Sequence, residues 1–367
     1  MRVFLLSLML FTMNAVFSQE NYVFVGTYTK AGSEGIYVFK MNASDGSLKK
    51  VSSIVSENPS YLALSPDKKF LYAANENGKN KGGVTAFSFD RATGKLTKIN
   101  EQLSNGDHPC YISVDPSNKW VAVGNYSGGN FSVYPILENG GIGTAAQVIK
   151  HSGGSVDKGR QEGPHVHSVV FTPDGKYLVV TDLGTDKIMA YPFNASASKP
   201  VAEQADPQVS STPGSGPRHI VFHKALPYAY VIEEMSGMVA AYDVNNPERE
   251  IQRINSHPAD YKGSIGSAAI KISNDGKFLY ASNRGESNTI AVFAIDQSNG
   301  QLQSKGFVKS GGKGPRDFSI DPSDAFLYAA NGESDNITIY KRNKETGLTT
   351  GEGKSMAIPA PVCILFF

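Results

Sequence analysis

The feature that most constrains this chain is a short segment that recurs along most of its length. The segment PSYLALSPDKKFLYAAN, residues 59–75, returns with substitutions at residues 109, 166, 217, 267 and 315, so successive copies lie 50, 57, 51, 50 and 48 residues apart. A unit of about fifty residues with several short apolar runs is typical of a four-stranded propeller blade. Each copy alternates apolar and polar residues, and no helical periodicity is sustained. The sequence therefore predicts an all-β fold.

The two ends of the chain each carry part of a further copy. Residues 361–367, PVCILFF, resemble the first strand of the repeat, whereas residues 21–30, NYVFVGTYTK, match the second strand without a first. Pairing between these two segments would close a ring and protect the edges that an open array exposes. We therefore predict a seven-bladed β-propeller with four-stranded antiparallel blades, closed by the C-terminal strand pairing with the N-terminal strands.

The first 18 residues have the composition of a signal peptide. Arg2 precedes an apolar run from Val3 to Phe11, and the small residues Ala15 and Ser18 follow it. The apolar run is too short to span a bilayer comfortably, although an uncleaved anchor remains the alternative interpretation. We expect residues 1–18 to be removed and residues 19–367 to form one exported domain, periplasmic or secreted, with no membrane span.

Charge and cysteine content exclude several classes of partner. The formal net charge of +1 gives no reason to expect nucleic acid or an anionic membrane as a partner. Cys110 and Cys363 are the only cysteines, too few for a disulfide framework, and both lie in apolar strand-like segments. We expect buried free thiols, a monomer, no cofactor and a small-molecule partner.

Aligning the copies places two sets of residues at the same end of every blade. In an antiparallel pair the start of one strand lies beside the end of the next, and the inner strands of a propeller line its central channel. At the start of the first strand stand Ser60, Cys110, His167, Arg218, Ala268, Arg316 and Val362. At the end of the second strand stand Glu76, Tyr126, Leu183, Glu234, Arg284, Gly332 and Tyr28. Both sets are expected to ring one mouth of the channel.

Ionisable residues in these two sets are concentrated in the third to sixth copies. Arg218, Arg284 and Arg316 supply forked donors suited to a carboxylate, a phosphate or a polarised carbonyl. His167 and Glu234 are the groups able to take a proton from water near neutral pH. Such a set around a concave opening suits an anionic or carbonyl-bearing small molecule.

Each of these residues also has a purely structural interpretation. Arg218 and Glu234, sixteen residues apart, could form an ion pair without further function. Arg316 could be neutralised by the adjacent Asp317, and Arg284 by Glu286. The convergence of unlike polar groups on one face is what favours a site.

A longer loop before the third copy adds residues to the same mouth. Residues 150–168, KHSGGSVDKGRQEGPHVHS, account for the 57-residue spacing and are expected to bring Arg160, Gln161 and His165 near His167 as substrate-binding groups. Two histidines at i and i+2 of a strand point the same way and could ligate a metal. No cysteine or clustered carboxylate completes such a set, so we expect no metal site. No nucleophile-elbow motif is present.

Four segments resemble a known family. RQEGPHVHSVVFTPDGKYLVVTDLGTDKI, GSGPRHIVFH, ASNRGESNTIAVF and KGPRDFSIDPSDAFLYAAN look like the bacterial lactonase family of seven-bladed propellers, which includes propeller-type 6-phosphogluconolactonases and is related to the fungal carboxymuconate lactonizing enzyme. The resemblance covers essentially the whole chain after the signal segment. It implies metal-independent opening of a lactone, with catalytic roles for His167, Arg218, Glu234 and Arg284.

The resemblance leaves the substrate and the reaction to be decided. 6-Phosphogluconolactone is a cytosolic intermediate, whereas this chain is expected to be exported, so an unphosphorylated sugar-derived lactone becomes an alternative. The leading hypothesis is a hydrolase in which Arg218 and Arg284 bind the anionic or carbonyl oxygen and either Glu234 or His167 activates water. Two further hypotheses are a muconate-type lactonizing isomerase and a non-catalytic exported propeller that binds a saccharide or a protein.

Overall fold

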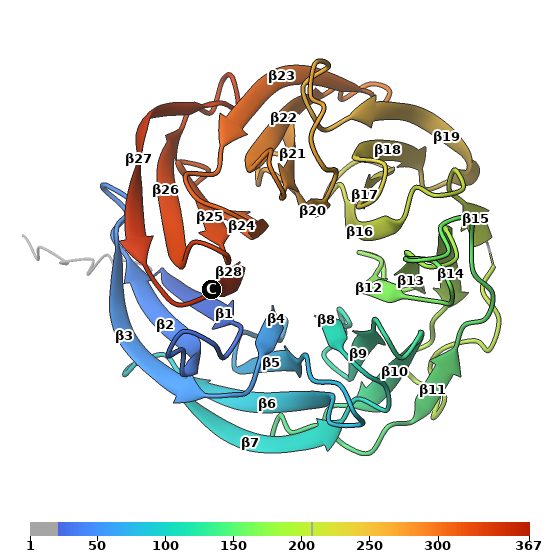
Figure 1. The fold of residues 1–367 in the computed structure, drawn as a ribbon. Coiled ribbons are helices and arrows are strands. Elements are labelled where there is room, and N and C mark those ends of the chain that lie inside the picture. Colours follow the sequence, from blue (N-terminus) through green and yellow to red (C-terminus); the bar gives the residue numbers. More distant parts are fainter. Residues whose placement is uncertain (1–20, 207) are drawn as a thin grey trace, which may run out of the picture.

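The structure is a computed structural model, and it describes residues 21–206 and 208–367. The predicted signal segment, residues 1–18, lies outside the described residues. Within them the regular structure consists of strands, arranged as seven four-stranded antiparallel sheets around a central channel (Figure 1). No helix in the described part of the chain has the length and apolar character needed to cross a membrane.

Each sheet is one blade, and we number the blades in the order of the six complete repeats, with the split blade as the seventh. The innermost strands of blades 1 to 7 are β4 (Pro59–Leu64), β8 (Pro109–Val114), β12 (Val166–Phe171), β16 (Pro217–Phe222), β20 (Ser267–Ile272), β24 (Pro315–Ile320) and β28 (Pro361–Phe366). The second strands are β5 (Phe70–Asn75), β9 (Trp120–Asn125), β13 (Tyr177–Asp182), β17 (Tyr228–Glu233), β21 (Phe278–Asn283), β25 (Phe326–Asn331) and β1 (Tyr22–Thr27).

The two outer strands of each blade vary more in length. The third strands are β6 (Gly83–Asp90), β10 (Asn130–Pro135), β14 (Lys187–Pro192), β18 (Met238–Asp243), β22 (Thr289–Ile295), β26 (Asn336–Arg342) and β2 (Gly35–Met41). The outermost strands are β7 (Lys95–Leu103), β11 (Gln147–Lys150), β15 (Gln208–Ser210), β19 (Asn246–Asn255), β23 (Leu302–Lys309), β27 (Thr349–Ala357) and β3 (Leu48–Val55).

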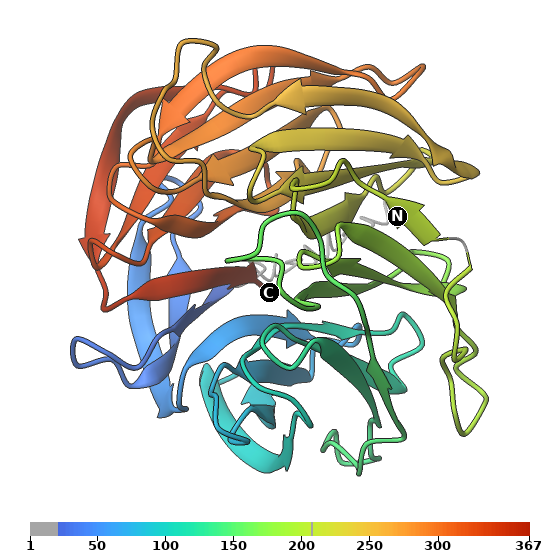
Figure 2. The same ribbon diagram turned by 45° about the vertical axis from the view of Figure 1, so that its right-hand side comes forward.

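The predicted ring closure is confirmed. Strand β28 pairs with β1 in antiparallel register, with Phe24 opposite Leu365 and Val25 opposite Ile364. Figures 1 and 2 show β28, in red at the C-terminal end, beside the blue strands of the N-terminal end. Blade 7 is therefore built from both ends of the described chain.

The core lies between neighbouring blades. Second and third strands are almost completely buried, and one cluster joins Phe131 of blade 2 to Phe171 and Leu178 of blade 3. Burial of one such side chain contributes about 2 kcal/mol relative to leaving it exposed. The alternating pattern of the repeat thus supplies apolar groups to both faces of every sheet, since each sheet packs between two others.

Candidate active site

The first strand of each blade contains an irregularity that aims one side chain at the channel mouth. In blade 4, Pro217 pairs with Glu233 and His219 pairs with Ile232, so Arg218 is an extra residue in a β-bulge. The same register shift falls at Ser60, Cys110, His167, Arg316 and Val362, and a wider one spans Ala268. Bulges locally bend a strand and redirect a side chain. They explain why the side chains at this set of positions face the channel mouth.

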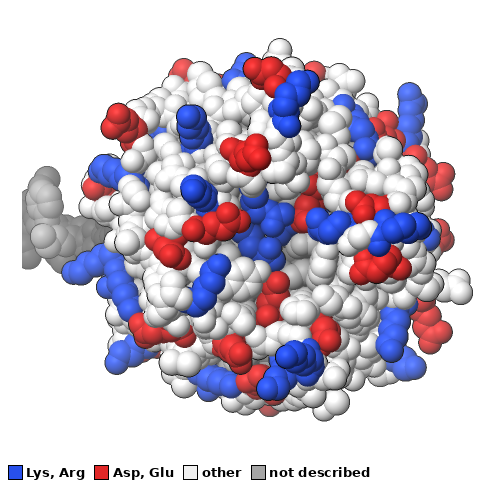
Figure 3. Space-filling model, viewed as in Figure 1, with Lys and Arg blue, Asp and Glu red and all other residues white. Residues whose placement is uncertain are grey.

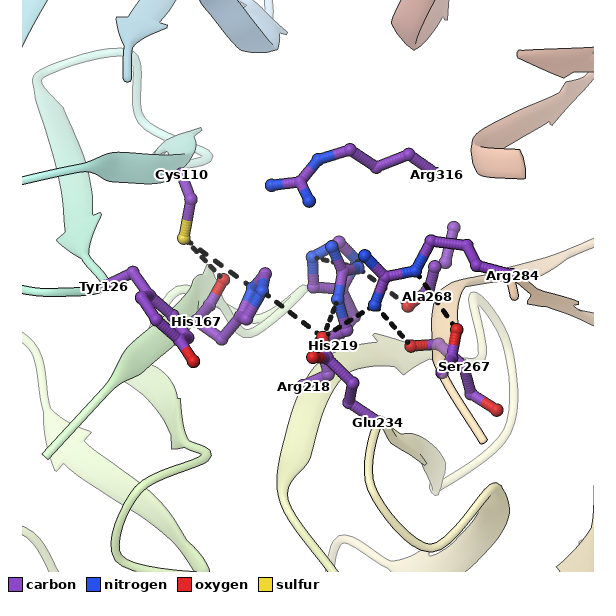
Figure 4. A network of polar contacts seen from close by, with 12 residues as sticks. Cys110, Tyr126, His167, Arg218, His219, Glu234, Ser267, Ala268, Arg284 and Arg316 are labelled. Carbon is purple, nitrogen blue, oxygen red and sulfur yellow. Dashed lines mark hydrogen bonds and ion pairs between the residues drawn. The ribbon is translucent and has the colours of Figure 1, made fainter. Parts of the chain in front are cut away.

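Glu234 is the centre of a network of cations at the channel mouth (Figure 4). Its Oε2 accepts a hydrogen bond of 2.9 Å from Arg218 Nε and lies 3.0 Å from Arg284 Nη2. Its Oε1 accepts a hydrogen bond of 2.7 Å from Arg160 Nη2, and His167 Nε2 lies 3.9 Å from Oε2. The structure therefore brings together five of the residues singled out from the sequence, from blades 3, 4 and 5.

Backbone carbonyls hold the two inner guanidinium groups. Arg218 Nη1 donates to the carbonyl of Ala268 at 2.8 Å, and Arg284 Nε donates to that of Gly266 at 3.1 Å. Arg284 pairs with Glu234 rather than with Glu286. Among the described residues no hydrogen bond occupies Nη2 of the buried Arg218 or Nη1 of Arg284.

A second, smaller ion pair lies on the other side of the mouth. Arg316 Nη2 lies 3.3 Å from Glu76 Oε2, which also accepts a hydrogen bond of 3.0 Å from the Tyr28 hydroxyl. Asp317 does not neutralise Arg316, because its carboxylate pairs with Lys271 at 2.9 Å. Arg316 is thus held by blades 1 and 7, and Figure 4 shows its guanidinium directed toward the other labelled side chains.

The loop residues predicted to bind substrate take different positions. Arg160 reaches the network and also donates to the Tyr126 hydroxyl at 3.3 Å. His165 stacks on the Tyr126 ring with centroids 4.4 Å apart, and its Nδ1 lies 3.1 Å from the Tyr126 carbonyl. Gln161 is fully buried and donates to the Leu183 carbonyl at 2.9 Å, so its side-chain amide anchors the loop rather than joining the Glu234 network.

Sequence reasoning missed His219, which lies in the channel next to Arg218. Arg218 Nη1 is 3.0 Å from His219 Nε2, and the His219 ring packs edge-on against Tyr61 and Tyr111 from blades 1 and 2. Simple strand alternation places consecutive residues on opposite faces, whereas the bulge lets both face the channel. Aligning a third position of the repeat, the residue after each bulge, would have pointed to His219. This set contains Tyr61, Tyr111, Ser168, His219, Ala269, Asp317 and Cys363.

Burial and neighbouring charges shift the titration of the network. Burial acts to raise the pKa of Glu234, but the charges of Arg284 and Arg218 outweigh it and hold this pKa well below its usual range. Burial and the Arg218 charge hold the pKa of His167 well below its usual value. Burial and the charges of Arg284 and Arg316 lower the pKa of Arg218 to about 10. At neutral pH the network holds a carboxylate, a neutral imidazole and cationic guanidinium groups.

Cys110 is the nearest candidate nucleophile, but its environment suppresses the thiolate. Its Sγ lies 3.7 Å from His167 Nδ1. Burial raises the pKa of Cys110 to about 12, and both cysteines are buried free thiols, as the sequence predicted. Because the thiolate is the reactive form, covalent catalysis by Cys110 is disfavoured.

The mouth is a hollow that holds a concentration of positive charge. Figure 3 shows Lys and Arg atoms at the hollowed centre of the face. Below it lies a cavity of about 10 Å³, lined in part by Ser60, Arg218, His219 and Arg316, with room for about one water molecule. Among the described residues no group of His, Cys, Asp and Glu side chains is arranged to hold a metal ion.

Comparisons with known proteins agree with this architecture. A family model described as Lactonase, 7-bladed beta-propeller matches residues 22–366. The chain is 38% identical to a 6-phosphogluconolactonase of Bacillus subtilis over 94% of this chain and 97% of that protein. It is 40% identical to a 6-phosphogluconolactonase of Formosa agariphila over 89% and 93% of the two chains.

One solved structure with a similar fold is of a protein described as periplasmic. The periplasmic gluconolactonase of Pseudomonas aeruginosa superposes with a TM-score of 0.89 at 35% identity, covering 94% of this chain and 98% of that one. The family match spans almost all described residues, and the relatives align along nearly their whole lengths. The chain belongs to the lactonase family of seven-bladed β-propellers.

Proposed function

We propose that this protein hydrolyses a sugar-derived lactone at the channel mouth. The single observation that carries the proposal is the Glu234 network, in which Arg218, Arg284 and Arg160 surround one carboxylate while the neutral His167 lies 3.9 Å from it. Membership of the lactonase family and the names of the relatives support the reaction class.

His167 is the better candidate for the group that activates water. A base must be unprotonated at the working pH, and the low pKa of His167 keeps its imidazole neutral. Glu234 is a weaker candidate because both of its carboxylate oxygens are already occupied by guanidinium groups. Its carboxylate instead positions those groups and stabilises the imidazolium that forms when His167 accepts a proton.

The proposed reaction balances with water as the only co-reactant. The water oxygen adds to the lactone carbonyl carbon while His167 Nε2 takes one of its protons. Charge that develops on the carbonyl oxygen is stabilised by the unoccupied nitrogens of Arg218 and Arg284. The ring C–O bond then breaks, the imidazolium returns the proton to the departing alkoxide, and the product is an open-chain hydroxy acid.

The decisive experiment is a lactone-opening assay on substitutions at two neighbouring glutamates. Glu234→Gln keeps the side-chain shape but removes the charge that organises the network, and it is expected to lower kcat/KM about 100-fold, as removal of a transition-state contact does. The matched control is Glu233→Gln, because Glu233 is also buried and pairs with Arg253 away from the mouth, with Arg253 Nη2 at 2.7 Å.

The control is expected to lose stability while retaining turnover. Wild-type activity from Glu234→Gln and from Arg218→Ala would remove these residues from the reaction. Assays on glucono-lactone with and without a 6-phosphate, run side by side, decide the substrate. No turnover of either lactone, together with saturable saccharide binding insensitive to Arg218→Ala, would favour the non-catalytic alternative.

A further inference from the structure

Six of the seven junctions between described blades are closed on their outer side by the same kind of contact, which we call the seal. An aromatic side chain from a second strand donates a hydrogen bond to a backbone carbonyl in the outer hairpin of the next blade. These bonds join Tyr22 to Arg91, Tyr72 to Gly140, Trp120 to Ala195, Tyr230 to Gly300, Tyr280 to Gly347 and Tyr328 to Gly46, at 2.6–3.0 Å. The aromatic ring and the turn together fill the space between blades.

The junction between blades 3 and 4 lacks this seal. Val179 of β13 stands where Tyr72, Tyr230, Tyr280 and Tyr328 stand in other blades, and no hydrogen bond of this kind joins β13 to blade 4 within the described residues. The outer hairpin of blade 4 is also shorter, since Asp243 pairs with Asn246 and only Val244 and Asn245 form the turn. In blade 5 the equivalent turn separates Ile295 from Leu302. Tyr177, at the position from which Tyr22 and Trp120 make their bonds, lines this junction but makes no such bond in the described part of the chain. The hydrogen bond and the long turn are therefore both missing at one place.

The result is a groove of about 660 Å³ between blades 3 and 4. Its walls are apolar and come from both blades, and they include Val179, Ile188, Val209, Ile220, Phe222 and Tyr242. Its rim is formed by the turns after β12 and β16. Those turns lie at the ends of strands that begin at His167 and Arg218, so the groove opens on the face opposite the channel mouth. Its volume is within the range of small-molecule sites.

The charged side chains of the rim select the class of ligand. Lys176 and Lys224 line the groove, and both are exposed. Asp174 lies 3.3 Å from Lys176 as a surface pair, and Lys224 Nζ donates to Asn274 Oδ1 at 3.1 Å. Two cations against one carboxylate leave a net positive rim. His223 is already used within the chain, since its Nδ1 lies 3.0 Å from the Leu226 amide and its Nε2 lies 3.0 Å from the Gly276 carbonyl.

We propose that this groove binds a small amphiphilic aromatic anion. Its rings would occupy the space that a tyrosine at the Val179 position fills at four other junctions, packed against Val179, Phe222 and Tyr242. Its carboxylate or sulfonate would lie at the rim beside Lys176 and Lys224. This site is separate from the channel mouth, and it does not depend on the proposed lactone hydrolysis.

The test uses 8-anilinonaphthalene-1-sulfonate as the probe, with its binding followed by fluorescence and its stoichiometry by calorimetry. One molecule is expected to bind each folded chain. Val179→Tyr introduces the residue found at this position in four other blades, and it is expected to weaken binding about tenfold or more by filling the groove. Val179→Ala, which enlarges the groove, is the matched control and is expected to retain binding.

The role of the rim is tested with a neutral partner probe, N-phenyl-1-naphthylamine, which lacks the sulfonate. Lys176→Glu combined with Lys224→Glu is expected to weaken the anionic probe about tenfold while leaving the neutral one within about twofold. Lys277→Glu, in the corresponding turn of blade 5, is the control for surface charge. These variants do not touch the groove walls, so they test the site even if Val179→Tyr fails to fold.

Three outcomes would overturn the proposal. One is the absence of saturable binding to the folded wild type; another is binding that Val179→Tyr and the lysine variants leave unchanged. The third is a concentration-dependent dimer in sedimentation that Val179→Tyr dissociates, which would assign the groove to a second copy of this chain. Lactone turnover is expected to be the same in all of these variants.

Discussion

Glu233 and Glu234 are adjacent in the chain, yet their surroundings give them opposite titration behaviour. Burial raises the pKa of Glu233 to about 7, despite its bidentate contacts with Arg253. Glu234 is also buried, but three guanidinium groups within 3.0 Å keep it ionised. The number of cations around a carboxylate therefore decides its charge here, because burial acts in the same direction on both.

At the same scale, His167 is expected to make folding stability depend on pH. Its pKa is lowered on folding by burial and by Arg218, so below its unfolded value near 6.5 the unfolded chain binds the extra proton. The stability that neutral His167 contributes is complete above that value and is lost as the pH falls toward the folded pKa. We expect a loss of about 1 kcal/mol from this group between pH 7.5 and 5.5.

This expectation is checked by urea unfolding of the wild type and of His167→Asn at both pH values. The difference between the two proteins isolates His167 from Glu233, whose raised pKa acts in the opposite direction over the same range. A pH dependence identical in both proteins would contradict the assignment of a neutral buried imidazole.

At the scale of the element, the bulged inner strand of five blades follows a residue in the left-handed conformation. In five blades that residue adopts a positive φ and is followed by proline, and these residues are Asn58, His108, Gly216, Gly314 and Ala360. The residue with positive φ redirects the chain at the start of the strand. The bulge residue that faces the channel lies two positions later. The direction of Arg218 thus depends on the backbone at Gly216.

Gly216→Ala is expected to damage both stability and activity. Gly216 has a φ of +65°, and an added Cβ would lie 2.9 Å from Met235 Cγ. The substitution is expected to cost about 1 to 2 kcal/mol and to displace Arg218. Urea unfolding and kcat/KM measure the two effects.

Gly351→Ala is the matched control for this substitution. Its φ of +72° carries the same backbone strain, but nothing lies within 4 Å of the added Cβ, in outer strand β27. It is expected to lower stability while leaving activity unchanged. Equal activity in Gly216→Ala and Gly351→Ala would show that the bulge does not orient Arg218.

At the scale of the whole molecule, stability depends on closing the ring. Strand β28 supplies the inner strand of blade 7, and Asp317 of blade 6 accepts a hydrogen bond of 2.8 Å from the Ile364 amide. Removing residues 361–367 would expose apolar edges on blades 1, 6 and 7. We expect the truncated chain to lose several kcal/mol of stability and its cooperative thermal transition.

A circular permutant distinguishes the effect of losing strand β28 from the effect of moving the chain ends. Joining Phe367 to residue 21 with a short linker and opening the chain before Pro59 keeps every strand pair of the ring. This permutant is expected to melt cooperatively and to retain lactone turnover. A permutant that melts like the truncated chain would mean that the chain ends themselves, rather than closure, hold blade 7 together.

The sequence by itself determined the features that depend on local repetition. The spacing of the copies predicted the number of blades, and the split copy predicted the pairing of β28 with β1. Because a hairpin brings positions a fixed distance apart in sequence to one end of a blade, the repeat pattern alone was enough to place Arg218 and Glu234 together.

Only the tertiary structure decided which partners meet across the ring. Arg316 pairs with Glu76, 240 residues away, rather than with its neighbour Asp317. Arg160 reaches Glu234 from a loop, and the bulge brings His219 into the channel against Tyr61. The open groove beside Val179 likewise arises where, among the described residues, blade 3 makes no aromatic hydrogen bond to blade 4 and the outer turn of blade 4 is short. Such contacts depend on distances across the channel and between sheets, which the pattern within one repeat does not encode.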